Sequence, residues 1–224
     1  MSQYRRLFPW IIPVSLFLLI IPGFSQSREK ETDIGERVQA FLAKMQGRWY
    51  DMNVPGADGE ILYGLIIENG YTKALEIGTS TGRSGIYIAW ALSKTGGRLT
   101  TIEIDEGRYR EAVANFQEAG LSAYIDARLA DAHDLVPQLP GPFDFVFIDA
   151  DKHWYTNYAR AVVPKLAPGG CIAAHNVYER RGRWGGYGGT GDYYEYMKNL
   201  PGFSTRILSE SRGGISVSFK DKEK

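Results

Sequence analysis

The chain has 224 residues, of which 26 are Lys or Arg and 26 are Asp or Glu, so the formal net charge is +0 at pH 7. This length is enough for one sizeable domain with its own core. The balanced charge argues against a global field that attracts nucleic acid, and we expect no nucleic-acid partner. The single cysteine, Cys171, excludes an internal disulfide and a cysteine-rich metal site.

The first 25 residues differ in composition from the rest of the chain. Arg5 and Arg6 precede an apolar run, residues 8–24, that ends in small residues, and this order is typical of a secretory signal cleaved after Ser25. A retained membrane anchor is the alternative, although three prolines in the run argue against one regular spanning helix. We therefore predict a signal peptide or anchor over residues 1–25, which is also the candidate for membrane association, and an exported or anchored domain over residues 26–224. An inverted anchor, with the domain in the cytoplasm, is the second alternative.

From Lys73 onward, short β-prone runs alternate with longer helical patterns, which predicts a parallel sheet covered by helices on both faces. The predicted strands are residues 73–77, 99–104, 124–129, 143–149 and 170–174, and the predicted helices are residues 33–45, 59–68, 84–92, 106–119 and 154–166. Two more β-prone runs, residues 203–208 and 215–219, are joined by six residues, too few for a crossover helix, so we expect them to pair antiparallel. The predicted fold class is α/β with a doubly wound sheet.

A glycine-rich stretch, residues 182–191, surrounds Trp184 and Tyr187 and is predicted to be a loop. It fits a mobile lid over an aromatic acceptor and a disordered connection equally well. Trp154 and Tyr155 each fit two roles equally well: packing in the core, or stacking on an aromatic acceptor.

The segment Glu76-Ile-Gly-Thr-Ser-Thr-Gly82 directly follows the first predicted strand. In doubly wound sheets, ligands bind beyond the carboxyl ends of the central strands, so this turn lies where a nucleotide-like ligand binds. Its Gly-x-x-x-Gly spacing differs from the Gly-x-Gly-x-x-Gly turn that holds a dinucleotide pyrophosphate, and the acidic Glu76 favours a cationic ligand. S-adenosylmethionine carries a sulfonium and an ammonium group and no phosphate, so we predict it as the cofactor. A plain strand-to-helix connection would leave Glu76 unexplained.

Acidic residues also follow the second and third predicted strands. Glu103 ends the second strand, where an acceptor can take both ribose hydroxyls of an adenosine; its alternative role at the next helix start is already filled by Asp105 and Glu106. Asp131 follows the third strand and can accept from the adenine amino group, or it can cap a helix.

These segments, together with Phe147-Ile-Asp-Ala-Asp-Lys152, resemble the metal-dependent O-methyltransferases typified by the catechol and caffeoyl-CoA O-methyltransferases. The Phe147–Lys152 segment is the most specific motif, and the resemblance runs from Val54 to Phe219. It implies a Rossmann-like, seven-stranded, mostly parallel sheet whose last strand pair is antiparallel. The implied cofactor contacts are Val54, Glu76, Gly78, Thr79, Ser84, Glu103, Asp131, Ala132 and Asp149.

In that family an acidic residue after the fourth strand and an Asp-Asn pair after the fifth hold a divalent ion, usually Mg²⁺. The resemblance therefore implies Asp149, His175 and Asn176 as metal ligands. Histidine in place of the aspartate removes a negative charge and an oxygen donor, which favours Mn²⁺, Fe²⁺ or Zn²⁺ over Mg²⁺. A metal-free site in which His175 acts as acid or base, and a purely structural His175, are the alternatives.

Lys152 matches the general base of that family. A lysine accepts a proton only when burial or a nearby cation depresses its pKa, and a solvated lysine at a helix start is the alternative. His133, on a predicted exposed helix, and His153 are expected to be solvated or to pack.

The sequence thus predicts an O-methyltransferase for a small hydroxylated acceptor, aromatic or catechol-like. The first alternative is an S-adenosylmethionine-binding or interaction protein in which His175 marks lost chemistry. The second is a dinucleotide oxidoreductase, against which the glycine spacing speaks. Export conflicts with the cytoplasmic supply of S-adenosylmethionine, and the oligomeric state stays open, a homodimer included.

Overall fold

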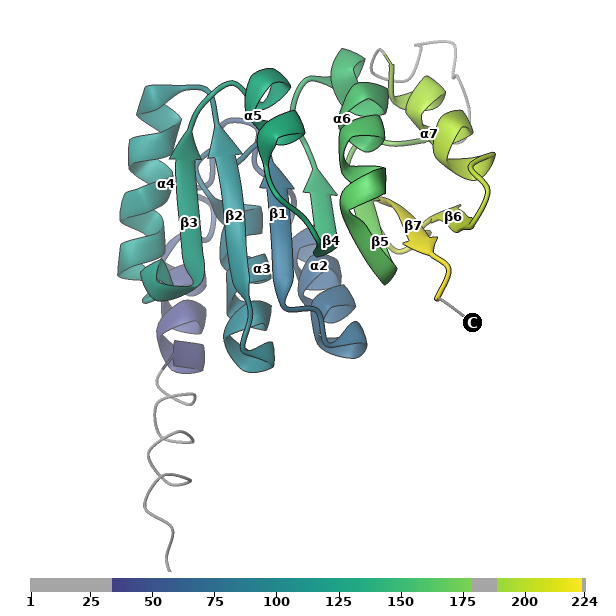
Figure 1. Cartoon of the computed structure of the whole chain (residues 1–224). Helices are drawn as coiled ribbons and strands as arrows, with labels where there is room; N and C mark the ends of the chain where they lie inside the picture. Colours follow the sequence, from purple (N-terminus) through teal and green to yellow (C-terminus); the bar gives the residue numbers. More distant parts are fainter. Residues whose placement is uncertain (1–33, 179–188, 223–224) are drawn as a thin grey trace, which may run out of the picture.

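A seven-stranded sheet forms the centre of the molecule. The computed structural model describes residues 34–178 and 189–222, and its strands lie in the order β3-β2-β1-β4-β5-β7-β6 (Figure 1). The strands are β1 (Lys73–Ile77), β2 (Arg98–Glu103), β3 (Ile125–Leu129), β4 (Phe143–Ile148), β5 (Leu166–Ala174), β6 (Phe203–Ile207) and β7 (Ser216–Lys220). The first five are parallel, whereas β7 pairs antiparallel with both β5 and β6. The predicted fold class, including the antiparallel last pair, is confirmed.

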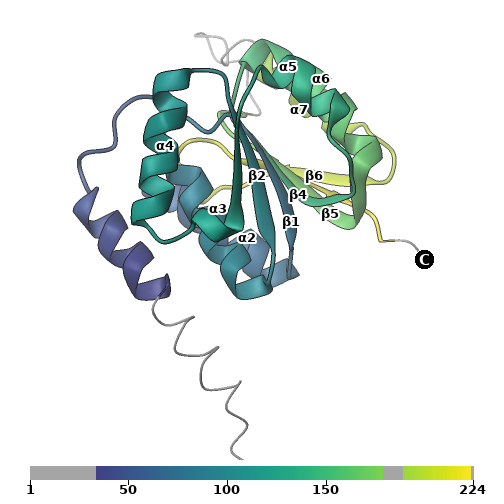
Figure 2. The ribbon, with the colours of Figure 1, turned by 60° about the vertical axis from the view of Figure 1, so that its left-hand side comes forward.

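Helices cover both faces of this sheet. They are a helix over residues 34–44, α2 (Gly56–Asn69), α3 (Arg83–Thr95), α4 (Glu106–Glu118), α5 (Ala132–Gln138), α6 (Tyr155–Val162) and α7 (Thr190–Lys198), with short 3-10 turns at Ser122–Tyr124, Lys152–Trp154 and Val163–Lys165. Figure 2 shows α2, α3 and α4 on one side of the sheet and α5, α6 and α7 on the other. This arrangement is the doubly wound one that the alternating pattern predicts.

Two core clusters, one on each face, hold these layers together. In β4, Phe145 and Phe147 pack with residues of α2, α3 and α4, while Val146 and Ile148 pack with residues of α5, α6 and α7. Neighbouring side chains of a strand point to opposite faces of the sheet. A strand whose two faces are both covered by helices therefore has an apolar residue at nearly every position. The near-continuous apolar run of β4 is explained in this way.

The structure changes two details of the sequence prediction. Thr190 and Gly191 were predicted as loop but begin α7, with Gly189 as its N-cap. Residues 182–188 of the glycine-rich stretch, with Trp184 and Tyr187, lie outside the described residues. Of the two ambiguous aromatic residues, Tyr155 is fully buried in the core, whereas Trp154 is 38% exposed and stacks on His133.

Backbone hydrogen bonds continue the sheet past the strand ends and align the residues that follow them. The amide of Gly78 donates to the carbonyl of Ile102 (3.1 Å), that of Asp149 to Ile77 (2.9 Å), and that of His175 to Ile148 (3.0 Å). Residues after β1, β4 and β5 are therefore brought to the same edge. This edge is where the sequence predicts the ligand.

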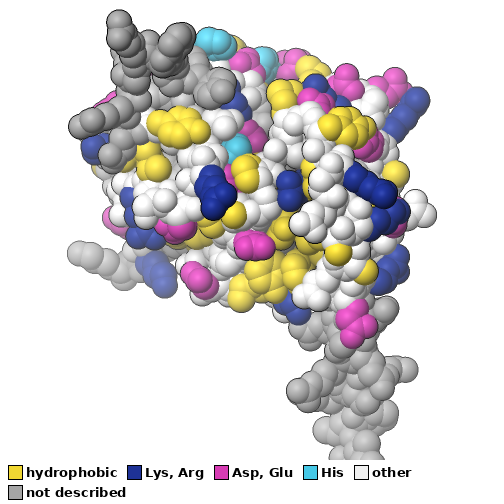
Figure 3. Space-filling model, turned by 180° about the vertical axis from the view of Figure 1, so that it is seen from behind, with side chains coloured by type: hydrophobic (Ala, Val, Ile, Leu, Met, Phe, Trp, Pro, Cys, Tyr) yellow, Lys and Arg dark blue, Asp and Glu magenta, His cyan; other side chains and the backbone are white. Residues whose placement is uncertain are grey.

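Two observations concern the predictions about a membrane and about nucleic acid: the character of the described helices and the distribution of charge on the surface. Over the described ranges, no helix has both the length and the apolar character needed to cross a membrane. Residues 1–25, the predicted leader, lie outside these ranges, so the localisation stays a prediction. On the face shown in Figure 3, positive and negative side chains are interspersed.

Candidate active site

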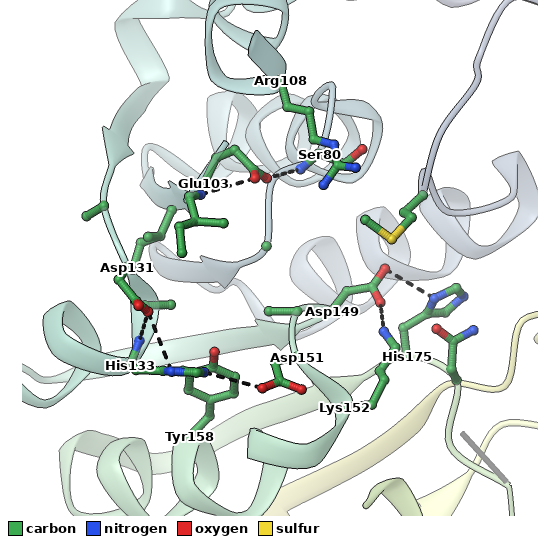
Figure 4. Close-up of a pocket in the computed structure, with 18 of the residues that line it drawn as sticks. Ser80, Glu103, Arg108, Asp131, His133, Asp149, Asp151, Lys152, Tyr158 and His175 are labelled. Atoms are coloured by element: carbon green, nitrogen blue, oxygen red, sulfur yellow. Dashed lines mark hydrogen bonds and ion pairs between the residues drawn. The ribbon is translucent and has the colours of Figure 1, made fainter. Parts of the chain in front are cut away.

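A cavity of about 750 Å³ opens at the carboxyl edge of the sheet, where the order of strands reverses at β1 (Figure 4). Eight of the predicted site residues line it: Gly78, Glu103, Asp131, Ala132, Asp149, Lys152, His175 and Asn176. A cavity of this volume is in the range of cofactor and substrate sites. The topological switch point of a doubly wound sheet is also where such ligands bind.

The turn after β1 forms one wall. Gly78 has φ 94°, and a Cβ there would lie 2.4 Å from the carbonyl oxygen of Asp149, so only glycine lets the turn approach the end of β4. Ser80 also adopts a left-handed conformation, with φ 50°, and lines the cavity. Thr79 is nearly buried, and its hydroxyl bonds to Thr101. Ser80, rather than Thr79, therefore lines the cavity, and Ser80 is not among the cofactor contacts predicted from the sequence.

Three of the predicted cofactor contacts lie behind this wall. Glu76 is fully buried, and Val54 and Ser84 are nearly so; within the described chain, none of the three lines the cavity. Glu76 Oε2 accepts from the Thr101 hydroxyl at 2.6 Å, while Oε1 has no hydrogen-bond partner among the described residues. Burial raises the pKa of Glu76 to about 8, and the hydrogen bonds from Ser84 and Thr101 offset only part of this rise.

Glu103 lies at the end of β2 and faces the cavity. Its Oε2 accepts from the amide of Ser80 at 2.7 Å, and its Oε1 accepts from the amides of Ile104 and Asp105 at 3.1 and 3.0 Å. These bonds hold the carboxylate rigidly and tie it to the turn after β1. A carboxylate has about four acceptor positions, so three backbone donors leave capacity for a ligand hydroxyl.

The far end of the cavity carries a histidine between two carboxylates. Asp131 caps α5 by accepting from the amide of His133 at 2.8 Å, so it is both a cap and a cavity residue. The His133 ring lies 3.7 Å from Asp131 and 3.5 Å from Asp151 and stacks on Trp154. His133 therefore packs, as expected, but it also lines the cavity, whereas His153 is exposed.

The opposite end holds four interacting charged side chains. Asp149 Oδ1 accepts from Lys152 Nζ at 2.5 Å, and Asp149 Oδ2 lies 3.2 Å from His175 Nδ1 (Figure 4). The other ring nitrogen, Nε2, lies 3.0 Å from Oδ2 of Asp58, a fully buried residue of α2. Lys152 Nζ also donates to the Tyr155 hydroxyl at 2.8 Å.

These contacts shift the pKa of both central groups. Burial alone would lower the pKa of His175, but the hydrogen bonds and charges of Asp149 and Asp58 outweigh it and raise the pKa above its ordinary value. Burial alone would raise the pKa of Asp149, but His175 and Lys152 outweigh it and hold the pKa low. The His175 ring therefore has a carboxylate at each end, and this arrangement favours its protonated form, which can donate to both.

The predicted metal ligands lie together, but their donor atoms do not fit a divalent ion. Both nitrogens of His175 point to carboxylates, and each oxygen of Asp149 already faces a cationic side chain. Asn176, with φ 58°, donates its amide to the carbonyl of Gly213 at 3.3 Å. Over residues 34–178 and 189–222, no three His, Cys, Asp or Glu side chains are grouped to hold a metal.

Asp58 is the main residue that sequence reasoning missed. It is 117 residues from its partner His175 along the chain, and it lies just before the predicted helix over residues 59–68. No local pattern connects the two residues, because the fold alone brings the start of α2 to the end of β5.

The sheet order and the cavity at the switch point define an α/β protein of the methyltransferase fold. A family model described as "O-methyltransferase" matches residues 25–186, and the chain belongs to this family. The resemblance seen in the sequence is thereby confirmed.

Individual relatives agree with this family. A catechol O-methyltransferase of Niastella koreensis is 44% identical over 107 residues, which are 46% of this chain and 48% of the relative. A caffeoyl-CoA O-methyltransferase of Stellaria longipes is 35% identical over 121 residues, 51% of this chain and 47% of the relative. The chain thus matches about half the length of these relatives. A solved O-methyltransferase from Bacillus cereus, in complex with SAH, has a TM-score of 0.69 and 29% identity over 85% of this chain and 91% of that one.

Proposed function

We propose that the protein is an S-adenosylmethionine-dependent O-methyltransferase that acts on a small phenolic, aromatic or catechol-like acceptor. The observation that carries this proposal is that one cavity contains both the Ser80–Glu103 wall and the cluster of Asp149, Lys152 and His175. A cofactor and an acceptor can therefore bind side by side, which is what direct group transfer requires.

The cofactor is proposed to bind along the turn after β1 and the ends of β2 and β3. Ser80 Oγ is buried without a hydrogen-bond partner among the described residues, and Glu103 keeps acceptor capacity toward the cavity. Such groups suit a ribose and a polar amino-acid portion. We assign the contacts to Gly78, Ser80, Glu103, Asp131, Ala132 and Asp149. The cofactor supplies an activated methyl group on a sulfonium, and SAH in the Bacillus cereus structure supports the assignment.

The acceptor is proposed to place its hydroxyl beside Lys152 and His175. Cationic N–H donors stabilise an oxygen anion, so they lower the pKa of a phenol bound next to them. Lys152 donates to Asp149 and Tyr155, so in this arrangement it serves as a cation, and the base role implied by the resemblance stays a prediction. No step is assigned to Mg²⁺, Mn²⁺, Fe²⁺ or Zn²⁺, because the donor atoms do not fit a divalent ion.

Replacing Glu103 with alanine is expected to weaken S-adenosylmethionine binding about 10- to 100-fold, because one charged acceptor and the support of the Ser80 amide are lost. Calorimetric titration of the full chain measures this loss. Glu106→Gln is the control, since Glu106 forms a surface pair with Arg110 and does not line the cavity. Equal affinity of the Glu103→Ala variant and the unchanged protein would contradict the cofactor assignment.

The alternative function, cofactor binding without turnover, is supported by His175 standing where the family has an aspartate. Incubating the full chain with S-adenosylmethionine and a panel of catechols separates the two functions. Methylated product is expected; tight cofactor binding with no product from any catechol would favour the alternative.

We also propose that residues 1–25 direct export or anchoring. Fractionation of cells that express the native chain is expected to place the protein outside the cytoplasm or in the membrane fraction. A full-length chain in the soluble cytoplasmic fraction would contradict this proposal.

A further inference from the structure

We propose that this protein transfers the methyl group without a divalent ion, and that Asp58 is a positioning residue that fixes His175 in the place of a metal. The inference rests on the proposed function, since it concerns the same cavity. Three independent features of the described residues carry it: the use of the ring nitrogens, the surroundings of Asp58, and the balance of charge around Asp149.

The His175 ring has no nitrogen left for a metal. Nε2 lies 3.0 Å from Asp58 Oδ2 and Nδ1 lies 3.2 Å from Asp149 Oδ2, at opposite ends of a ring that is 7% exposed. A histidine binds a metal through the lone pair of a ring nitrogen, whereas a ring that donates at both nitrogens offers none. A metal could enter only by displacing one of these carboxylates.

Asp58 is held by four donors, which make its position fixed. Its Oδ1 accepts from the Ser211 hydroxyl (2.9 Å) and the Arg212 amide (3.2 Å), and its Oδ2 accepts from the Gly213 amide (3.0 Å) and faces His175. The carboxylate is fully buried. Burying a carboxylate costs free energy unless hydrogen bonds or opposite charges compensate it. Here the three donors of the β6–β7 connection compensate it and hold it against the His175 ring.

Gly213 shows that the β6–β7 connection is shaped around this pair. A Cβ at Gly213 would lie 2.1 Å from His175 Nε2 and 2.3 Å from Asp58 Oδ2. Only glycine lets the connection cover the two side chains and supply its amide. The carbonyl of Gly213 also accepts from the side-chain amide of Asn176, so the same connection holds both His175 and Asn176, the two residues that follow β5.

The charges around Asp149 are already balanced. Two carboxylates, Asp58 and Asp149, face two cationic side chains, Lys152 and His175. A divalent ion bound to Asp149 would lie next to both cations, and like charges this close repel strongly in a partly buried site. The His175 ring, paired with both carboxylates, instead provides a fixed positive charge where the resemblance implies the ion.

In the transfer step, the acceptor hydroxyl releases its proton to solvent, and its oxygen forms a bond to the methyl carbon. The bond between carbon and sulfur breaks, and its electron pair stays on sulfur. The remaining N–H of Lys152 donates to the oxygen anion before the attack, the charge of the nearby His175 ring stabilises it further, and Asp58 keeps the ring in place.

The first test measures metal binding and metal dependence in the full chain after treatment with EDTA. Turnover of a catechol is expected to change less than about twofold on addition of Mg²⁺ or Mn²⁺, and equilibrium dialysis is expected to show no stoichiometric binding of Mn²⁺. In the His175→Asp variant, Mn²⁺ binding is expected to appear, because an oxygen donor replaces the donating ring. Stoichiometric Mn²⁺ binding by the unchanged protein, or turnover that EDTA removes and Mg²⁺ restores, would overturn the inference.

The second test asks whether Asp58 acts through His175. Asp58→Asn is expected to lower kcat about 100-fold and to leave the calorimetric Kd for S-adenosylmethionine and the acceptor KM nearly unchanged. Glu60→Gln, an exposed change on the same helix, is the matched control. A purely structural role would change cofactor binding together with kcat. If Asp58→Asn does not fold, Ser211→Ala, which removes one donor to Asp58, is expected to lower kcat with the same selectivity. Unchanged kcat in either folded variant overturns the role of Asp58.

The results separate this inference from the proposed function. Absence of S-adenosylmethionine binding and of product in the unchanged protein contradicts the proposed function, while the Mn²⁺ dialysis still decides the metal question. Metal-stimulated turnover contradicts only the inference.

Discussion

Replacing Asp149 with asparagine is expected to lower kcat/KM for methyl transfer about 1000-fold, and to lower the free energy of unfolding by about 3 kcal/mol. Asp149 accepts from Lys152 at 2.5 Å and from His175 at 3.2 Å, so the substitution leaves two cationic side chains without their shared carboxylate. Its amide group would turn an N–H donor toward one of them. Steady-state kinetics and denaturant unfolding measure the two effects.

The matched control is Asp126→Asn, which breaks a surface pair with Arg128 and is expected to change neither quantity by much. Turnover of Asp149→Asn within tenfold of the unchanged protein would show that the carboxylate does not organise the two cations. A large loss of stability with normal turnover would limit Asp149 to a structural role.

The sequence predicts the fold well because its signals are local. The strands carry β-prone runs that glycine or acidic residues end, and these ends place Glu103, Asp131 and Asp149 at one edge of a parallel sheet. Two short helices received no predicted bounds: α7, which was not predicted, and α5, of which only His133 was placed on a helix. α5 has seven residues and contains Pro137, so its apolar period is too brief to recognise.

The direction of individual side chains is less predictable. Thr79 and Ser80 are neighbours, but the left-handed conformations of Gly78 and Ser80 turn the serine, not the threonine, to the cavity. Glu76 precedes the strand end by one residue and points into the layer between sheet and helix, where it contacts Thr101. β1 is buried on both sides, so alternation of polarity does not show which face a residue takes.

Long-range partners are not predictable from one sequence at all. His175 stands out as a departure from the family pattern, but its role depends on Asp58, Lys152 and Asp149 together. The sequence therefore leaves the metal question open, and only the geometry shows that both ring nitrogens are used.

Glu76 is the second position where a large effect is expected. Its carboxyl is fully buried, one oxygen has no partner among the described residues, and the pKa is raised from 4.5 to about 8. Between these two values the unfolded chain loses the proton and the folded chain keeps it, so the free energy of unfolding falls as pH rises. A buried group that lowers the free energy of unfolding in this way is typical of a functional site. Glu76 does not line the cavity, so the predicted contact between its carboxylate and a cationic cofactor stays a prediction.

Replacing Glu76 with glutamine is expected to stabilise the fold by about 3 kcal/mol at pH 7 and by much less at pH 5, because glutamine keeps an acceptor for Thr101 and has no proton to lose. Denaturant unfolding at the two pH values measures the difference, with Glu60→Gln as an exposed control on α2. A gain that is the same at both pH values would show that the Glu76 carboxyl ionises normally in the folded protein. If the carboxylate also supports the cofactor, the more stable variant binds S-adenosylmethionine more weakly, so stability and affinity move in opposite directions.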